Sequence, residues 1–437
     1  NNYPILGLLV RINIFHNNDS ETDPYKYYDD IYVDGVPIKK WVNVIIRVTA
    51  QNVVDVYING TLTKRHKLSN AVKQNYDKIE HPNRLSPIYI TLLLVFKKIF
   101  FSLEIARFVL LHILILSQLY FYKCLKIVYQ NKFSLDKKVL FFLSCIIFIS
   151  PSFRSNIIWV ESSMFGLLFF MIGLYYFLKN LKKVNLKNVY LNILFIAIAS
   201  YIRPSYCLFA VYFFYFYFSF LKNKISIYNI VLLNIILAFP AFYYVFVMEV
   251  FFFKWHIGSQ FSESNLNYYN KIAIISSIII FHSIPFLYYK KFFLSNLNKK
   301  KLLIFFSFVS SFFLILNFDY NMNNAGGGIF LHISNFLSGN NYLFYLMLPF
   351  FIFLILNSLK ISLSNNFIVI TILLLITPQY HIFHKYYDPL IFVLCLTIIN
   401  FNLSKKFFTK KRFITISYLL FISHYLISFV NSYYIKF

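Results

Sequence analysis

Two patterns of hydrophobic and polar positions divide the chain near residue 80. Before that point, apolar and polar residues alternate in short runs at 8–15, 41–50 and 53–60, which is typical of β-strands. The last run closes on Asn59-Gly60, a dipeptide typical of β-hairpin turns. From about residue 104, long apolar runs alternate with short lysine-rich segments, which is typical of membrane-spanning helices.

The clearest predicted span lies within residues 151–183. Seventeen uncharged residues separate Glu161 from Lys179, and lysines beyond such a run favour a cytoplasmic end there. Residues 86–100 are apolar but short and interrupted by lysines, so we expect a helix lying in the interface. The other apolar runs fall at 104–128, 138–151, 188–202, 204–221, 226–253, 271–289, 302–317, 342–359, 366–380, 386–402 and 413–432. The sequence therefore predicts a mainly α-helical polytopic bundle of about twelve spans.

The basic residues orient these spans. If the connecting segments alternate between the two membrane faces, one face carries 22 lysines and arginines, at 123–138, 179–187, 222–224, 290–301, 360 and 405–412. The other face carries six, at 154, 203, 254, 271, 385 and 436. Cytoplasmic loops are enriched in basic residues, so the first face is predicted to be cytoplasmic. The N-terminal segment then lies outside the cytoplasm.

Composition agrees with a membrane protein. The 437 residues are 59% hydrophobic and 13% charged, with mean hydropathy +0.62, which excludes an ordinary soluble domain of this size. The formal charge of +26 does not indicate a nucleic-acid partner, because the lysines lie in clusters between apolar runs. The four cysteines lie in apolar runs without metal-ligand spacing, so we expect buried, inert thiols and predict no metal site.

The predicted orientation gathers charged side chains at the outer ends of several helices. Each alone has a simple explanation, since an arginine at a helix end often reaches lipid headgroups. Together they can form a polar cavity in which cations bind a phosphate and acids transfer protons or bind hydroxyls. The candidate catalytic acids are Glu161, Asp319 and Asp388, and the candidate phosphate- and donor-binding residues are Arg154, Arg203, His384 and Lys385.

Three phrases in this part of the chain carry a resemblance to a known family. They are SPSFRSNIIWVESSMFGLLFFMIGLYYFL at 150–178, AIASYIRPSYCLFAVYFFYF at 197–216 and YHIFHKYYDPLIF at 380–392. With them, residues 81–435 resemble integral-membrane glycosyltransferases of the C-type fold (GT-C), including hexosyl- and mannosyltransferases. The resemblance implies a sugar donor linked to polyprenyl phosphate and a site on the non-cytoplasmic face.

The resemblance also implies a catalytic acid in the first outer loop, and here the sequence departs from the family. The first span and most of that loop would precede Glu80, which is the nearest acid to the matching position. The chain also starts without methionine, so we expect a fragment. A copy that lacks the base would be truncated or inactive.

The N-terminal segment resembles a second family. The run WVNVIIRV at 41–48, then DVYINGTL at 55–62 and KRHKLSNAVKQNYDKI at 64–79, are similar to concanavalin A-like and laminin-G-like domains. About half of such a domain is present, so we expect an incomplete β-sandwich. Such domains often bind glycans or Ca²⁺, but a structural module is the simpler interpretation. Its acids are expected to be turn and surface residues, at Asp29, Asp30, Asp34 and Asp55.

These observations lead to one functional hypothesis and two alternatives. The hypothesis is a multi-pass membrane glycosyltransferase with an N-terminal segment at 1–80, a linker with an interfacial helix at 81–103 and a membrane domain at 104–437. Its partners would be a polyprenyl-phosphate sugar, a glycan, lipid or protein acceptor, and membrane lipids of the bacterial inner membrane or endoplasmic reticulum. A divalent metal is left open as a cofactor. The alternatives are a lipid or solute transporter or flippase, and a non-enzymatic chimera of a lectin-like head and a partial membrane domain.

The sequence NAGGGIF at 324–330 lies in a predicted outer loop. Three consecutive glycines permit a close backbone approach, but they match no phosphate-loop spacing. A re-entrant loop and a contact with the carrier phosphate both stay open.

Overall fold

A computed structural model describes most of the chain. The described residues are 8–13, 28–33, 44–48, 53–58, 61–67, 95–96, 98–99, 103–130, 135–158, 162–221, 224–243, 246, 267–289, 300–320, 326–377, 382–401, 408 and 411–433. The chain divides into two compact units, one of residues 1–82 with 433–437 and one of residues 83–432. Each unit is described by itself.

The first unit contains two antiparallel sheets. Strand β1 (Leu8–Asn13) pairs with β2 (Tyr28–Val33), and β4 (Val53–Ile58) lies between β3 (Val44–Val48) and β5 (Thr61–Lys67). Ile58 pairs with Thr61, so β4 and β5 form the hairpin predicted at Asn59-Gly60. The predicted turn at Asp34-Gly35 and the expected interfacial helix fall on segments that are largely outside the described residues.

Asp55 corrects one expectation for this unit. We expected a surface carboxylate, but Asp55 lies on the central strand, opposite Arg47 on one side and Arg65 on the other. Arg65 Nε donates to Asp55 Oδ1 at 2.6 Å and its Nη2 donates to Oδ2 at 3.2 Å. The carboxylate is 3% exposed, because strands cover both of its flanks and the guanidinium takes the place of water.

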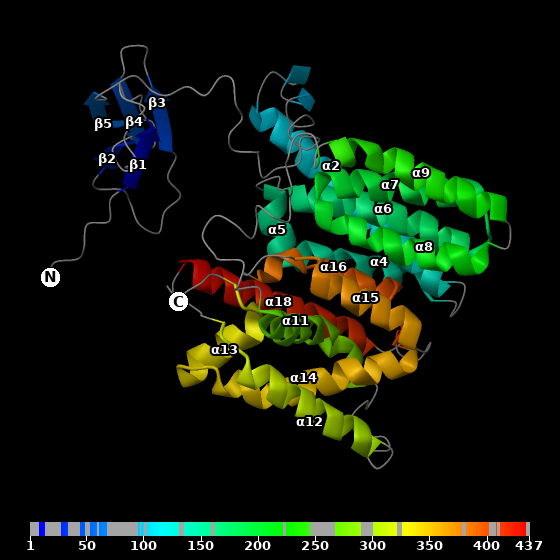
Figure 1. The fold of residues 1–437 in the computed structure, drawn as a ribbon. Coiled ribbons are helices and arrows are strands. Elements are labelled where there is room, and N and C mark those ends of the chain that lie inside the picture. Colours follow the sequence, from blue (N-terminus) through cyan, green and yellow to red (C-terminus); the bar gives the residue numbers. More distant parts are fainter. Residues whose placement is uncertain are drawn as a thin grey trace. The chain divides into compact units, whose positions relative to one another are not determined.

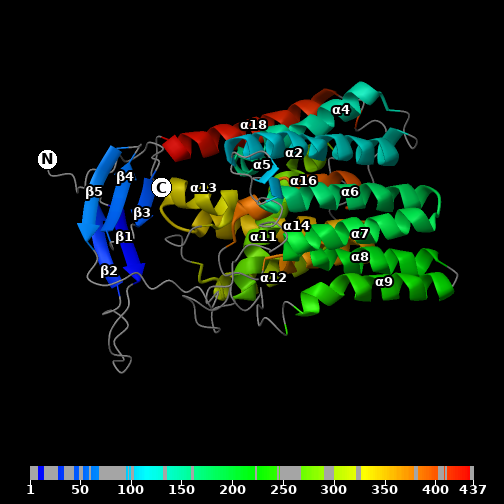
Figure 2. The same ribbon diagram turned by 90° about the horizontal axis from the view of Figure 1, so that it is seen from above.

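The second unit is helical, and fourteen α-helices are described in it. Figures 1 and 2 show α6, α7, α8 and α9 side by side, and α11 against α14. The helices are α2 (Leu103–Leu125), α4 (Lys137–Cys145), α5 (Pro151–Ile158), α6 (Ser162–Lys182), α7 (Leu186–Ile202), α8 (Leu208–Phe220), α9 (Lys224–Phe242), α11 (Tyr268–Tyr289), α12 (Lys301–Leu316), α13 (Gly328–Ser338), α14 (Tyr342–Ile361), α15 (Leu363–Leu375), α16 (Leu390–Thr397) and α18 (Lys411–Tyr433). Single turns lie at η2 (Lys126–Gln130), η3 (Ile146–Ile149), η4 (Pro204–Cys207) and η8 (His384–Tyr386).

Six helices in the described part of the chain are long and apolar enough to cross a membrane, which indicates a membrane protein. A seventh candidate is a pair bent by 67° at the break before Pro151. The six are Phe108–Gln130, Ser162–Lys182, Ile225–Phe242, Tyr268–Phe286, Tyr342–Ile361 and Arg412–Phe429. Five further apolar helices in the described part of the chain are shorter, because turns interrupt several of the apolar runs seen in the sequence.

Helices α6 and α7 form a close pair. A Cβ at Gly173 would lie 2.9 Å from the Ile196 side chain, so a larger residue there would require that side chain to shift, and glycine permits the close approach. Asn192 Nδ2 donates to the Gly173 carbonyl at 2.9 Å, and Tyr217 of α8 donates to Asn192 Oδ1 at 2.8 Å. These hydrogen bonds satisfy buried polar groups of α6, α7 and α8, so the C-terminal end of α7 is held in a fixed place.

That end is the turn at Arg203-Pro204, which the break between the predicted apolar runs at 188–202 and 204–221 indicates. Helix α7 ends at Ile202, Arg203 adopts an extended backbone with φ −141° and ψ 104°, and η4 begins at Pro204. Proline cannot continue the preceding helix and disfavours a helical residue before it, so the turn is confirmed. Cys207 in this turn is exposed, which corrects the expectation that all four thiols are buried. Cys124 and Cys395 are buried, and Cys145 is partly so.

Candidate functional site

The segment from Ile382 to Pro389 is the centre of the candidate site. It connects α15 to α16 and contains the turn η8. The Asp388 N–H donates to the His384 carbonyl at 3.1 Å, which closes one helical turn. Residues four apart on such a turn point to the same side, so His384 and Asp388 face one place although neither belongs to a long helix.

Asp388 is attached to the start of α5. Ser150 Oγ donates to Asp388 Oδ2 at 2.5 Å and accepts from the Phe153 N–H at 3.0 Å. Ser150 is therefore the cap of α5, with Pro151 at its first position, a typical helix start. Asp388 is 2% exposed, and its Oδ1 makes no hydrogen bond of good geometry within the described part of the chain.

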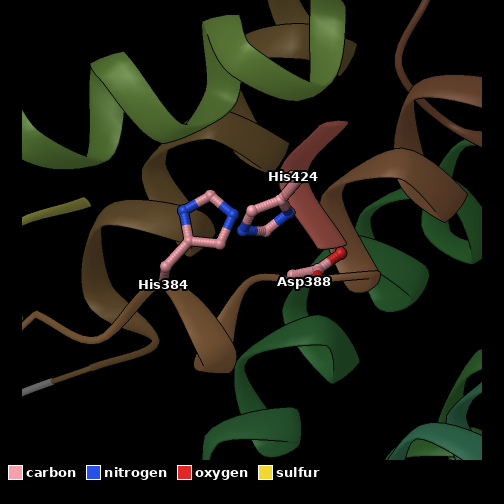
Figure 3. A group of neighbouring side chains, drawn as sticks. All are labelled: His384, Asp388 and His424. Atoms are coloured by element: carbon pink, nitrogen blue, oxygen red, sulfur yellow. The ribbon is translucent and has the colours of Figure 1, made fainter. Parts of the chain in front are cut away.

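Two histidines face this carboxylate. His384 and His424 of α18 have ring centroids 4.9 Å apart at 76°, and Figure 3 shows the His384 ring facing the His424 ring, with Asp388 beside His424. One ligand atom from each of the three residues lies within 4.8 Å of the others. His282 of α11 stacks on His384 at 5.2 Å. Phe281 packs edge-on against His384 and His424, so the group lies in an aromatic environment.

Burial determines the charge state of the two site groups outside the six long helices. It raises the pKa of the Asp388 carboxyl to about 6, with smaller opposing effects from Ser150 and Ser152. It lowers the pKa of His384 well below its ordinary value, and the neighbouring histidines act in the same direction. Desolvation disfavours the charged form of each group. The His384 ring is therefore neutral at physiological pH, which is the form that can bind a metal.

Two cations from distant parts of the chain meet at Tyr386. The Arg203 guanidinium carbon lies 4.5 Å from the centroid of the Tyr386 ring, and Lys385 Nζ lies 5.8 Å from the same centroid. Arg203 Nε also donates to Ser205 Oγ at 3.3 Å. The structure thus brings together two of the predicted phosphate-binding residues, next to the turn that carries His384 and Asp388.

Arg154 reaches the same region from α5. Its guanidinium carbon lies 4.6 Å from the centroid of Tyr425, which follows His424 in α18. The Arg154 side chain is exposed. Arg203 and Lys385 therefore lie at Tyr386, two residues before Asp388, and Arg154 lies at Tyr425, the residue after His424.

The glycine loop is bound to the central segment. The Gly327 N–H donates to the Ile382 carbonyl at 2.9 Å. Gly326 has φ +113°, and a Cβ there would lie 2.7 Å from the Tyr320 hydroxyl and 2.9 Å from the Ile382 carbonyl oxygen. The glycines thus permit contact between two backbone segments. Asn324 and Ala325 lie outside the described residues, so a contact with a ligand stays a prediction.

Asp319 is held at the neighbouring helix ends. The side-chain amides of Asn267 and Asn270 both donate to its Oδ1, the first at 2.9 Å, and its backbone N–H donates to Asn270 at 3.1 Å. The Asp319 side chain is exposed. Among the candidate acids in the described part of the chain, Asp319 is the one that an external substrate can reach, whereas Asp388 is buried.

A second set of contacts ties α11 to the central segment. Lys271 Nζ donates to the Thr377 carbonyl at 3.1 Å, and the Thr377 hydroxyl lies 2.5 Å from the Tyr387 hydroxyl. Lys271 was placed at the outer face on the basis of charge counts alone. It is buried, so its role is structural rather than one of attracting a ligand.

Two predicted acids, Glu80 and Glu161, lie outside the residues that the structure describes. The sequence reasoning also missed three residues of the site, namely Ser150, His282 and His424. A histidine inside an apolar helix was the available signal for His282 and His424, because a polar ring at that depth needs a partner. The expectation of no metal site relied on cysteine spacing and did not consider the His384–Asp388 spacing of one helical turn; it stays a prediction.

A cavity of about 350 Å³ lies at the other ends of the helices, near the lysine-rich end of α6. It is lined mainly by aromatic and aliphatic side chains, together with Ser362, Asn365 and Asn400. None of the predicted catalytic or phosphate-binding residues lines it. The candidate site is therefore the helix-end cluster around residues 382–389.

No protein-family model, curated protein or solved structure matches this chain. The function is therefore inferred from the site's own residues and geometry.

Proposed function

We propose that the chain is a GT-C-type membrane glycosyltransferase that takes a sugar from a polyprenyl-phosphate carrier. The observation that supports this most is the meeting of Arg203 and Lys385 at Tyr386. Two cations on an aromatic platform, each fixed by a turn, match the charge of a phosphate. An arginine fork adds two parallel hydrogen bonds to phosphate oxygens, which gives orientation as well as attraction.

The proposed chemistry is a direct displacement at the anomeric carbon. The acceptor oxygen forms a bond to that carbon while the bond from the carbon to the phosphate oxygen breaks, and the acceptor proton passes to a carboxylate. Negative charge grows on the leaving phosphate, and fixed cations lower the barrier there. Arg203 and Lys385 take this role, and Arg154 is placed to contact the rest of the donor.

Asp319 is the better candidate for the base among the described acids. Its carboxylate is exposed and its Oδ1 accepts two amide hydrogen bonds, which orients the side chain toward a substrate. Asp388 is too deeply buried to meet an acceptor hydroxyl, so we assign it to positioning the segment that carries Lys385 and Tyr386. Glu80 and Glu161 remain candidates.

The proposal includes a multi-pass topology of about twelve spans with the N-terminal segment outside the cytoplasm. Six long helices, one bent pair and several shorter apolar helices support this number. The shorter helices would cross as tilted or paired segments, as turns such as Arg203-Pro204 allow. The site then lies at the non-cytoplasmic face, where lipid-linked donors are used. The metal inferred below does not enter this reaction scheme.

We also propose that residues 1–80 form a partial concanavalin A-like sandwich with a structural role. Two antiparallel sheets and the cross-strand pair of Asp55 and Arg65 support a packed β-module. A glycan-binding role would need rim loops, which fall on segments outside the described residues.

The test is transfer of labelled hexose from polyprenyl-phosphate mannose and polyprenyl-phosphate glucose in membranes that contain the full chain. We expect Lys385→Gln to lower the transfer rate because it removes one of the two cations at Tyr386. Lys187→Gln is the matched control, since Lys187 is exposed at the opposite end of α7. Equal rates for all three proteins, or transfer no higher than in membranes without the chain, would contradict the proposal. A transporter would instead move the polyprenyl-phosphate sugar across the membrane without cleaving the sugar from it.

A further inference from the structure

The group of His384, Asp388 and His424 contains more buried polar atoms than its hydrogen bonds satisfy. Both ring nitrogens of His384, Nδ1 of His424 and Oδ1 of Asp388 have no hydrogen-bond partner among the described residues. Asp388 is 2% exposed and His424 is 8% exposed. Buried polar atoms are nearly always paired, so the orphan atoms of these three neighbouring residues indicate a missing partner between them.

We infer that His384, Asp388 and His424 bind a divalent transition-metal ion, with Zn²⁺ as the expected occupant. Their ligand atoms lie within 4.8 Å of one another and converge from η8, the segment before α16, and α18 (Figure 3). Imidazole nitrogens and a carboxylate oxygen are preferred by zinc and its first-row neighbours, whereas Ca²⁺ and Mg²⁺ prefer oxygen ligands alone. The inference goes beyond glycosyl transfer and does not depend on it.

The surroundings of the group are arranged as those of metal ligands are. Ser150 donates to Asp388 Oδ2, which fixes the carboxylate, and one carboxylate oxygen lies within 4.8 Å of a ring nitrogen of each histidine. His384 is held between His282, which stacks on it, and Phe281. Hydrogen bonds and packing around the ligands orient them and raise metal affinity. Zinc–nitrogen and zinc–oxygen bonds of about 2.0–2.1 Å require ligand atoms closer together than 4.8 Å, so the three side chains move inward when they bind an ion.

Binding would link three parts of the helical unit that are far apart in sequence. His424 belongs to α18, Asp388 is tied to the start of α5 through Ser150, and His384 precedes Lys385 and Tyr386. An ion at this place would hold the 382–389 segment against α5 and α18. Its role is therefore to position the cations at Tyr386 rather than to act on a substrate.

The test is zinc binding by the full chain, purified in detergent with an affinity tag that contains no histidine. The protein is incubated with zinc chloride and desalted, and its metal content is measured by mass spectrometry. Cobalt is used in parallel because its visible absorption reports the ligand set. We expect about one zinc per chain, as one three-residue group predicts. We expect His384→Ala, Asp388→Asn and His424→Ala each to weaken binding by at least about tenfold, since even supporting residues contribute that much.

Two further variants separate the site from general effects on the fold. Ser150→Ala keeps all three ligands and is expected to weaken zinc binding by about 10–100-fold. His112→Ala removes an exposed histidine of α2 and is expected to leave binding unchanged. Substoichiometric zinc in the wild-type chain would overturn the inference, as would equal losses in His112→Ala and His424→Ala. Arg203→Lys is expected to retain zinc whether or not it binds a lipid donor. The zinc site and the glycosyltransferase function are therefore tested by different measurements.

Discussion

The Ser150 hydroxyl donates a 2.5 Å hydrogen bond to the Asp388 carboxylate and joins two segments that are 238 residues apart. The same serine caps α5 by accepting the Phe153 N–H. One side chain thus fixes both the start of a helix and the orientation of a buried acid. The candidate site depends on such long-range contacts, and each of them can be tested by a single substitution.

Gly326→Ala should disturb the site without preventing membrane insertion. A Cβ at this position would lie 2.9 Å from the Ile382 carbonyl oxygen, so the backbone of the central segment must move. The positive φ adds strain of about 1–3 kcal/mol for a residue other than glycine. We expect lower thermal stability together with about tenfold weaker binding of undecaprenyl or dolichyl phosphate, measured on purified protein in nanodiscs.

Gly339→Ala is the matched control for that substitution. Gly339 also has a positive φ, of +67°, but a Cβ there meets no atom within 4 Å. It should lose comparable stability and bind the lipid phosphate normally. If both alanine variants weaken lipid binding equally, the contact between the glycine loop and Ile382 does not matter for the site.

The charge asymmetry predicts the accessibility of single cysteines. The chain should first carry Cys207→Ser, because Cys207 is exposed near Arg203. In that background, Lys183→Cys should resist an impermeant thiol reagent in intact cells, whereas Ser264→Cys should react. Lysine-rich segments remain in the cytoplasm, and residue 183 lies within the one at 179–187. Labelling of residue 183 from outside would show that the orientation is wrong.

Arg65→Met should destabilise the N-terminal β-unit. The Asp55 carboxylate is 3% exposed, while Arg65 is 64% exposed, so most of the expected loss comes from removing the Arg65 hydrogen bonds to a buried acceptor. That cost is about 1–3 kcal/mol. Hydrogen exchange of the β4 and β5 amides in the full chain measures it. Lys64→Met, on the neighbouring exposed position of β5, should show the same amide exchange as the wild type. Equal amide protection in the Arg65→Met and Lys64→Met variants would show that the pair of Asp55 and Arg65 does not stabilise the unit.

Local sequence patterns were sufficient to predict the helices, strands and turns. The arrangement of the candidate site depends on long-range packing. The Asn59-Gly60 hairpin and the Arg203-Pro204 turn follow from backbone preferences of a few residues, so the sequence predicts them correctly. Charge and apolar length likewise predict the six long helices. The contact of Ser150 with Asp388 and the stacking of His282 on His384 depend on how distant helices pack, and no local pattern contains that information. Asp55 was misplaced for the same reason, since its burial depends on two neighbouring strands.

Binding of a polyprenyl phosphate by Arg203→Lys tests the central claim most directly. The wild-type chain, Arg203→Lys and Arg154→Lys are compared in nanodiscs with dolichyl and undecaprenyl phosphate, which needs no knowledge of the acceptor. The guanidinium of Arg203 is held over Tyr386 beside Lys385, and lysine lacks its planar fork. Loss of one charge-assisted hydrogen bond, ~1.5–3 kcal/mol, weakens binding by about tenfold or more. We predict that loss for Arg203→Lys and a smaller one for Arg154→Lys; unchanged binding in Arg203→Lys would contradict a phosphate-binding role.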